Sequence, residues 1–329
     1  MPNRAAPRYS RILGVGAHRP SRIVRNAELA AVTGRSDEWI RRRTGVAERR
    51  YAAPDETVLE MAVQASTKAL AAAAVLASRV DVVLLASMSD LRQSPPSAPQ
   101  LAHRLGSTAA ALDLGAACSG FCHTLSVAGS LVRSGQADHV LVVGSERMTD
   151  IVAPDDPSSG FLFADGAGAV VVGPSDEPGL GPTVWGSDGG RAGLIGHDAS
   201  WLEYRDDPQR RWPTMRMDGQ DVYRWAIETL PAVAHRALAD AGVKAADLDA
   251  FIPHQANLRM VDTIVERMEL PDHVAVARDV IHSGNTSAAS IPLAMAQLSE
   301  TGALRSGALA LLVGYGAGLS YAAQVVLLP

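Results

Sequence analysis

Three polar side chains of this chain could together carry out thioester chemistry, and the first of them is a cysteine. Cys118 lies in the small-residue segment 114–120, which follows an apolar run and precedes a helical pattern. The NH groups at the start of a helix stabilise a thiolate, so we expect the thiol pKa to lie below its usual value of about 8.5. A buried structural cysteine is the alternative that burial statistics favour. The small neighbours, however, leave room for an acyl group on the sulfur.

A histidine and an asparagine further along the chain are the candidate partners of Cys118. His254 ends an apolar strand in the segment 251–257, and Asn285 opens a helical pattern in the segment 284–290. Taken alone, His254 could be a satisfied strand-end histidine and Asn285 an ordinary helix cap. All three residues lie at strand-to-helix junctions, and such junctions can converge if they share one edge of a sheet. The spacing therefore allows one site built from Cys118, His254 and Asn285.

The elements that must position these residues follow the same order in two halves of the chain. Short apolar runs predict strands, and longer periodic runs predict helices between them, a pattern typical of parallel sheets covered on both faces. We predict strands at 82–86, 111–114, 140–143, 167–172, 250–253, 274–277, 308–313 and 321–328, and helices at 56–76, 121–132, 221–241, 258–268 and 287–298. A linker at 174–182 separates an N-terminal half, 1–174, from a C-terminal half, 175–329. Cys118 and Asn285 then hold equivalent places, with two helix N-termini aimed at one buried site.

Composition narrows the class of protein. The chain has 329 residues, 47% hydrophobic and 20% charged, with a net charge of −5 and a pI of about 6.0, which argues against nucleic-acid binding. We find neither the apolar core of a signal peptide near the first residue nor an apolar run of about 20 residues, so we expect a cytoplasmic protein with no membrane contact. Cys118 and Cys122 lie one helical turn apart without further metal-ligand spacing, so we expect no metal, and Cys122 is interpreted as a helix-packing residue.

Several segments together resemble one known family. Residues 117–120, 254–259 and 284–290 resemble the catalytic motifs of β-ketoacyl-acyl-carrier-protein synthase III, a family of the thiolase superfamily, and residues 36–40, 43–45, 164–169 and 314–320 are similar to its other motifs in family order. The resemblance implies an α/β fold with the five-layer αβαβα thiolase architecture, made of two pseudo-symmetric halves. It also implies a homodimer.

The resemblance implies a role for each of the three polar residues. Cys118 would accept an acyl starter from acyl-CoA, and the acyl group would then be condensed with malonyl-acyl-carrier protein. His254 and Asn285 would donate hydrogen bonds to the enolate that decarboxylation leaves. The backbone NH groups of Cys118 and Ala317 would form the oxyanion hole. No cofactor is implied, because acyl-CoA and the phosphopantetheine-linked malonyl group are substrates.

The same resemblance implies residues that hold the substrates. Trp39 is similar to an aromatic residue that stacks on adenine, Arg43 to a phosphate contact, and Asn257 to a residue that hydrogen-bonds pantetheine. Arg224 and Arg259 are similar to members of a basic patch that docks the acidic carrier protein. Each of these side chains could also be an ordinary surface or rim residue.

Two further positions concern the choice of acyl donor. Pro157 stands where many relatives carry an arginine that closes over adenine, which favours a weaker grip on CoA and a carrier-bound starter. Met88 and Ser94 belong to the loop 88–96, which in relatives shapes the acyl pocket across the dimer. Ser94 is small, and the loop resembles that of priming ketosynthases of type II aromatic polyketide pathways. A buried methylene contributes about 0.8 kcal/mol, so we expect starters larger than acetyl.

Other uses of a Cys, His and Asn set are weighed against this interpretation. A degradative thiolase needs a second cysteine near the C-terminal glycine turn, and residues 314–321 contain none. A papain-type protease usually places Trp after its nucleophile and carries disulfides, and neither is present. An acyltransferase that passes the acyl group to an alcohol or amine, and a silent scaffold subunit, remain open, as does the choice between fatty-acid and polyketide synthesis.

Overall fold

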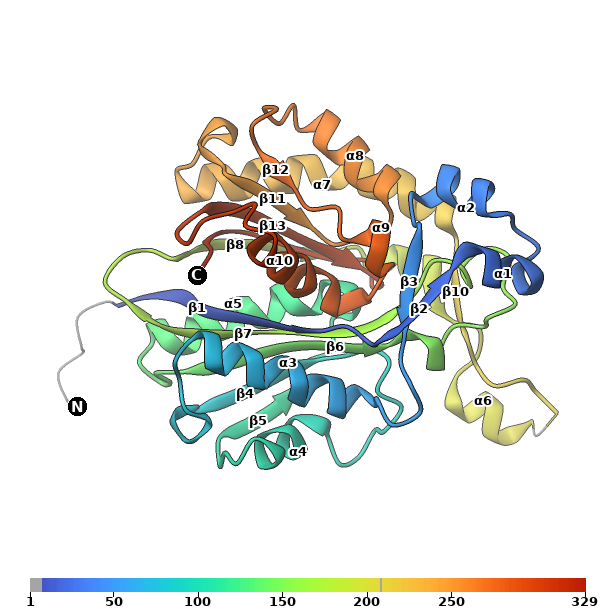
Figure 1. Cartoon of the computed structure of the whole chain (residues 1–329), viewed down its shortest axis with the longest axis horizontal. Coiled ribbons are helices and arrows are strands. Elements are labelled where there is room, and N and C mark those ends of the chain that lie inside the picture. Colours follow the sequence, from blue (N-terminus) through green and yellow to red (C-terminus); the bar gives the residue numbers. More distant parts are fainter. Residues whose placement is uncertain (1–7, 208) are drawn as a thin grey trace.

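Two five-stranded sheets lie in layers, with helices between them and on both outer faces (Figure 1). The computed structural model describes residues 8–207 and 209–329. Three large hydrophobic cores fill the spaces between adjacent layers. The five-layer αβαβα order that the resemblance implies is therefore confirmed.

The first sheet comes from the first half of the chain. Its strand order is β1 (Tyr9–His18), β7 (Asp165–Ser175), β6 (Val140–Arg147), β4 (Val82–Ala86) and β5 (Ala110–Asp113). β4 runs parallel to β5 and β6, whereas β7 runs antiparallel to β6 and β1. The apolar run of β6 is buried because α3 (Val58–Ala72) and α4 (Ser97–Arg104) cover one face of the sheet and a central helical layer covers the other.

The second sheet repeats this plan with the second half of the chain. Its order is β8 (Leu180–Ser187), β14 (Ser320–Leu327), β13 (Leu309–Gly316), β11 (Ala250–Pro253) and β12 (Ala275–Val276), with the same sequence of antiparallel and parallel pairings as the first sheet. The outer helices are α7 (Gly219–Ala241) and α8 (Leu258–Arg267). The two pseudo-symmetric halves are thereby confirmed, while the domain boundary between 174 and 175 stays a prediction.

One helix from each half forms the central layer. These helices are α5 (Gly120–Arg133) and α10 (Ser290–Glu300), each preceded by a turn of 3-10 helix, at Ala117–Ser119 and Ser287–Ala289. Both helices are apolar on most sides and share one core with both sheets. The two 3-10 turns contact each other. Small residues line this contact, and a Cβ added at Gly120 would lie 3.6 Å from the Cβ of Ala288, an ordinary contact distance.

The residue of the C-terminal half that corresponds to Cys118 is not the one predicted. Ala117 and Ser287 both have left-handed backbone angles, with φ of 46° and 49°, and each opens the 3-10 turn of its half. Ala288 therefore corresponds to Cys118. The prediction that Asn285 holds this place is wrong by three residues, because Asn285 lies in an extended segment that pairs with Phe163 before the turn begins.

Two element boundaries also differ from those predicted. The linker expected at 174–182 is shorter, since β7 continues to Ser175 and β8 begins at Leu180. The helix expected at 56–76 spans Val58–Ala72, because Thr57 caps its start and the chain turns at Ala74. Capping and turn geometry set these ends, and apolar spacing does not reveal them.

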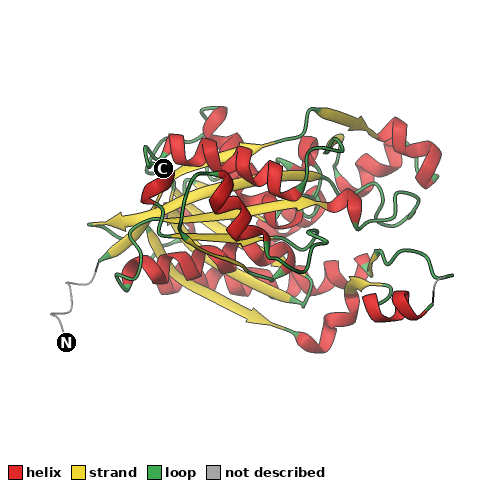
Figure 2. Ribbon diagram, turned by 90° about the horizontal axis from the view of Figure 1, so that it is seen from below, coloured by secondary structure: helices red, strands yellow, loops and turns green. Residues whose placement is uncertain are grey.

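Smaller elements gather at the end of the sheets away from the C-terminal residue (Figures 1 and 2). None of them was predicted from apolar spacing, because they are short. They are β2 (Arg22–Arg25), α1 (Asn26–Thr33), α2 (Asp37–Thr44), β3 (Glu48–Tyr51), β9 (Ile195–His197), α6 (Trp201–Asp206), β10 (Met215–Met217) and α9 (Val280–Ser283). Among the residues described, no helix combines the length and the hydropathy needed to cross a bilayer.

Candidate active site

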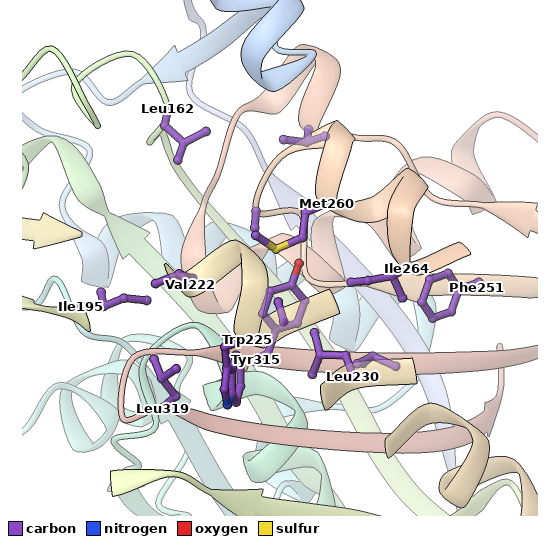
Figure 3. Close-up of a cluster of buried hydrophobic side chains, with 14 of the residues drawn as sticks. Leu162, Ile195, Val222, Trp225, Leu230, Phe251, Met260, Ile264, Tyr315 and Leu319 are labelled. Atoms are coloured by element: carbon purple, nitrogen blue, oxygen red, sulfur yellow. The ribbon is translucent and has the colours of Figure 1, made fainter. Parts of the chain in front are cut away.

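A cavity of about 840 Å³ extends from a basic rim to a buried floor and brings the three predicted polar residues together. Cys118, His254 and Asn285 all line it, and they are only 8%, 2% and 4% exposed. Figure 3 shows the apolar cluster that supports the cavity wall. Of the residues labelled there, Leu162, Ile195, Val222, Met260 and Tyr315 also line the cavity.

Cys118 lies in the 3-10 turn that leads into α5. The backbone NH groups of Cys118 and Ala317 lie near its sulfur, where they act to lower the thiol pKa. The oxyanion hole expected at these two groups stays a prediction. Burial nevertheless raises the pKa of the thiol to about 11, against the lowering effect of these NH groups. The expectation of a thiol pKa below 8.5 is therefore wrong for the free chain, because removal from water outweighs the helix terminus.

Two glycines near the end of β13 are required because the strand passes close to the nucleophile. A Cβ added at Gly316 would lie 2.6 Å from the Cβ of Cys118. A Cβ added at Gly314 would lie 3.0 Å from the sulfur of Cys122, which is buried one helical turn further along α5. Cys118 and Cys122 are both free thiols, and Cys122 packs against the sheet as predicted.

His254 follows β11 and is held in one orientation. Its Nδ1 lies 2.7 Å from the hydroxyl oxygen of Ser290, and Tyr315 packs edge-on against the ring at 5.1 Å. The backbone NH of Gln255 donates to the same Ser290 oxygen. The Ser290 hydroxyl hydrogen can therefore be directed at Nδ1, which leaves the ring hydrogen on Nε2. Burial lowers the pKa of His254 to about 3, so the imidazole is neutral.

Asn285 is fixed by its backbone and by one side of its carboxamide. Its backbone NH donates to the carbonyl of Leu162 at 3.0 Å, and its carbonyl accepts from the NH of Ala164 at 2.9 Å. The side-chain Oδ1 accepts from the backbone NH of Ser287 at 2.9 Å. Since the oxygen is held in this turn, the NH₂ group is the part of the carboxamide that remains to donate to a ligand.

The rim contains three of the residues predicted to hold a substrate. Trp39, Arg43 and Asn257 line the cavity. Trp39 lies in the first turn of α2 and packs edge-on against Phe161 at 5.3 Å. Asn257 caps α8, because its Oδ1 accepts from the backbone NH of Met260 at 2.9 Å.

Arg35 is a rim residue that the sequence did not reveal. Its guanidinium lies over the Trp39 ring, 4.6 Å from the ring centre, and its Nε donates to the carbonyl of Pro157 at 3.3 Å. The backbone of Pro157 thus holds Arg35 against the Trp39 indole, in place of the arginine that many relatives carry at position 157. A positive charge lies beside Trp39 although position 157 carries none.

The residues predicted for docking and for the acyl pocket are distributed differently. Arg259 lines the cavity rim, while Arg224 lies outside it on α7, paired with Asp221 at 2.8 Å. Met88 is half-buried and Ser94 is exposed, and neither lines this cavity. Among the described residues, no group of three or more His, Cys, Asp or Glu side chains could hold a metal.

Three further residues at the floor were missed at the sequence level. Ser287 Oγ lies 3.3 Å from Cys118 Sγ, Ser290 contacts His254, and the fully buried Glu146 accepts from the backbone NH of Ala288 at 3.3 Å. The sequence contained a feature that could have drawn attention to each of these residues. Glu146 is an acidic residue at the end of an apolar strand, and the two serines lie one helical turn apart beside Asn285.

Comparison with protein families gives consistent matches over both halves. The profile described as 3-Oxoacyl-[acyl-carrier-protein (ACP)] synthase III matches residues 112–189, and the profile for its C-terminal part matches residues 238–328. A beta-ketoacyl-[acyl-carrier-protein] synthase III from Streptomyces glaucescens is 49% identical over 329 residues, covering 100% of this chain and 98% of the relative. A mycobacterial beta-ketoacyl-[acyl-carrier-protein] synthase III from Mycobacterium marinum is 47% identical over 319 residues, covering 97% and 95%.

A solved structure is similar over the whole chain. The priming beta-ketosynthase from the R1128 polyketide biosynthetic pathway matches with a TM-score of 0.98 and 48% identity, covering 100% of this chain and 99% of the other. A 3-oxoacyl-[acyl-carrier-protein] synthase III from Aquifex aeolicus matches with a TM-score of 0.90 and 34% identity, covering 97% and 99%.

Proposed function

The chain belongs to the β-ketoacyl-[acyl-carrier-protein] synthase III family, and on that premise we propose how its cavity performs the reaction. The reaction is a decarboxylative Claisen condensation in which an acyl starter from acyl-CoA joins malonyl-acyl-carrier protein to give a β-ketoacyl-acyl-carrier protein. Acyl transfer to an alcohol or amine and a silent scaffold role are not favoured by these relatives.

The meeting of Cys118, His254 and Asn285 at one cavity is the observation that supports the mechanism most strongly. In the first half-reaction Cys118 attacks the thioester carbonyl of the starter, and the CoA thiolate leaves. The negative oxygen of the tetrahedral intermediate accepts from the backbone NH groups of Cys118 and Ala317, whose direction towards the sulfur supports this role.

In the second half-reaction the malonyl group loses CO₂, and an enolate forms. Its oxygen accepts from His254 Nε2–H and from the NH₂ group of Asn285. The contact between Ser290 and His254 Nδ1 supports the donor role of Nε2, and the local use of Asn285 Oδ1 supports the donor role of its NH₂. The enolate carbon then attacks acyl-Cys118, and the β-ketoacyl product leaves on the carrier protein.

The rim is proposed to hold the nucleotide and the pantetheine arm. Trp39 offers an aromatic face, Arg43 a phosphate contact and Asn257 a pantetheine contact. Arg35 already lies against Trp39 and would have to move or join the stack when adenine arrives. A starter delivered on a carrier protein needs no adenine site, so this arrangement supports a carrier-bound donor as well as CoA.

Docking of the carrier protein is proposed at Arg259 and Arg224. Carrier proteins in this chemistry are acidic, and positive side chains beside the cavity mouth attract them. Arg259 lies at the rim over Tyr223, 6.0 Å from the ring centre, and Arg224 lies one residue further along α7 from Tyr223.

A homodimer is proposed through β5. This strand ends the first sheet and therefore leaves one row of backbone groups unpaired. Its Leu112 is 42% exposed, and Leu91, in the loop with Met88 and Ser94, is 43% exposed. Pairing with a second copy would cover these side chains and bring the loop 88–96 to the acyl pocket of the partner. A small Ser94 there would leave room for starters larger than acetyl.

The proposed chemistry uses no resident cofactor, because a thiol, an imidazole and a carboxamide supply the nucleophile and the donors. A reducing compartment such as the cytoplasm would keep the Cys118 thiol free. The similarity to a priming ketosynthase supports a place at the start of polyketide synthesis.

Acylation by a mixed pool of acyl-CoA thioesters tests the proposed starter. We expect the Cys118 peptide to gain the mass of an acyl group longer than acetyl, and Cys118→Ala to gain none. A strict preference for acetyl would contradict the proposed pocket. Failure to gain any acyl mass from either CoA or carrier-protein donors would contradict the function.

A further inference from the structure

Glu146 is a buried acid that the mechanism above leaves without a role. It lies near the end of β6, is fully buried, and accepts hydrogen bonds through both carboxylate oxygens. Oε2 accepts from the hydroxyls of Ser87 and Ser89 and from the backbone NH groups of Met88 and Ser89. Oε1 accepts from the backbone NH of Ala288 at 3.3 Å. All these groups are donors, so the resting side chain is a carboxylate.

Ser287 connects this carboxylate to the nucleophile. Its hydroxyl oxygen lies 3.3 Å from Cys118 Sγ, and Glu146 accepts from the backbone NH of the next residue, Ala288. The Ser287 side chain is also near enough to the carboxyl group to lower the pKa of Glu146, against the raising effect of burial. In the structure the Ser287 hydroxyl donates to the sulfur. Because a carboxylate can only accept, the relay requires this hydroxyl to turn its hydrogen towards Glu146 while Cys118 is a thiol. The hydroxyl oxygen is then free to accept the S–H. When the sulfur has lost its hydrogen, the same hydroxyl can turn and donate to the thiolate.

The other titratable groups beside the sulfur are poor acceptors for its hydrogen. They are His254 from the end of β11 and Tyr315 from β13. Burial lowers the pKa of His254 to about 3 and raises that of the Cys118 thiol to about 11, and it also raises the pKa of Tyr315. Burial raises the pKa of Glu146 as well, which makes it the better base.

We propose that Ser287 relays the thiol hydrogen of Cys118 to Glu146, which holds it while the acyl group is on the sulfur. This inference deepens the proposed function and rests on it. Moving the hydrogen from sulfur to carboxylate leaves the net charge of the buried cluster unchanged, so no additional charge is created away from water. Glu146 lies beside Ala288, the residue of the C-terminal half that corresponds to Cys118.

The hydrogen can be followed through both half-reactions. In acylation, the S–H bond breaks, Ser287 takes that hydrogen and gives its own to Glu146, and the sulfur forms the new thioester while the CoA thiolate leaves and is protonated by water. In condensation, the malonyl carboxylate leaves as CO₂, and the enolate carbon displaces the Cys118 thiolate. Glu146 returns its hydrogen through Ser287 to that thiolate, which restores the resting site.

Alkylation of the free protein tests the relay without any acyl substrate. The rate of Cys118 modification by iodoacetamide is measured between pH 6 and 10 by peptide mass spectrometry. We expect Ser287→Ala and Glu146→Gln to slow it on the order of a hundredfold at neutral pH, the range for loss of a positioned base. The matched control is Ser145→Ala, which removes the neighbouring buried hydroxyl that donates to Val58. Its pH profile should match that of the parent.

A Ser287→Ala profile that superimposes on that of the parent overturns the relay, even if Glu146→Gln does not fold. Equal slowing by Ser145→Ala also overturns it, because the effect would then be general loosening of β6. These outcomes are distinct from failure of the proposed function, since iodoacetamide needs neither the oxyanion hole nor a thioester.

Proton stoichiometry tests the storage step. With Glu146 as the store, acylation by acyl-CoA in weak buffer near pH 7 takes up about one proton from water for each Cys118 acylated, because the released CoA thiol, with a pKa of about 8.5, is protonated. A pH indicator read during a single turnover measures this. Zero uptake overturns storage on Glu146.

Discussion

At the scale of single residues, the free hydrogen-bonding groups at the cavity floor are donors. Asn285 uses its side-chain oxygen locally, and His254 has its Nδ1 in contact with Ser290. Hydrogen-bond donors at the cavity floor stabilise the negative charge that develops on a substrate oxygen. One residue change and one pH profile separate this proposed role from a merely structural one.

The residue change is Asn285→Asp. An aspartate keeps the shape and can still accept from Ser287, but it replaces the NH₂ donor with a negative oxygen. We expect decarboxylation of malonyl-acyl-carrier protein to fall by about 10²- to 10³-fold, the usual loss for one such donor. Acylation of Cys118 by acyl-CoA, followed by mass, should stay within a few-fold of the parent. Equal loss of both half-reactions would point to disrupted folding instead.

The pH dependence of decarboxylation tests the neutral state of His254. Because burial lowers its pKa to about 3, the ring stays neutral as the pH falls from 8 to 5. We expect the single-turnover decarboxylation rate to show no acid limb near 6.5, the usual value for histidine. A loss of rate centred near 6.5 would mean that the imidazole is protonated there and is more hydrated than the structure shows.

At the scale of elements, the site depends on a close approach of β13 to the turn that opens α5. Gly316 permits this approach, because any side chain there would overlap Cys118. We expect Gly316→Ala to cost about 1–3 kcal/mol of unfolding free energy and to slow acylation strongly by displacing Cys118. Chemical denaturation and acyl mass measure the two effects.

Gly189→Ala is the matched control for this change, since a Cβ at Gly189 meets nothing within 4 Å. It should change neither stability nor acylation appreciably. A Gly316→Ala protein that is acylated at the parental rate would contradict the close contact between β13 and the nucleophile.

The central elements could be predicted from the sequence because their apolar periodicity is strong. The strand before His254 and the helix after Cys118 match their predicted spans within a residue or two. The place of Asn285 could not be predicted in this way, because a left-handed turn at Ser287 delays the helix. The role of Glu146 was also hidden, since its partners Ser89 and Ala288 come from distant segments that only the folded chain brings together.

At the scale of the whole molecule, the distribution of charge distinguishes the cavity mouth from the rest of a net-negative surface. The chain carries a net charge of −5, yet Arg35, Arg42, Arg43 and Arg259 all line the cavity. An acidic carrier protein would be attracted to this region and repelled elsewhere. The salt dependence of its association should therefore be strong.

Charge reversal at Arg259 tests the docking proposal. We expect Arg259→Glu to slow condensation with malonyl-acyl-carrier protein by at least about tenfold at low salt, and acylation by acyl-CoA much less. Arg236→Glu is the control, because Arg236 is an exposed arginine on the neighbouring helix α7 that does not line the cavity. Equal slowing of both half-reactions by Arg259→Glu would exclude a role limited to docking.

The most direct test of the central claim is the fate of one acyl group on Cys118. The protein is acylated, freed of excess donor and mixed with malonyl-acyl-carrier protein in a single turnover, while the masses of the Cys118 peptide and the carrier protein are followed with CO₂ release. We expect the acyl mass to leave Cys118 and appear on the carrier protein as a β-ketoacyl group, with about one CO₂ released for each acyl group lost. An acyl group that leaves as a free acid or an unextended ester or amide, without CO₂, would contradict decarboxylative condensation at this site.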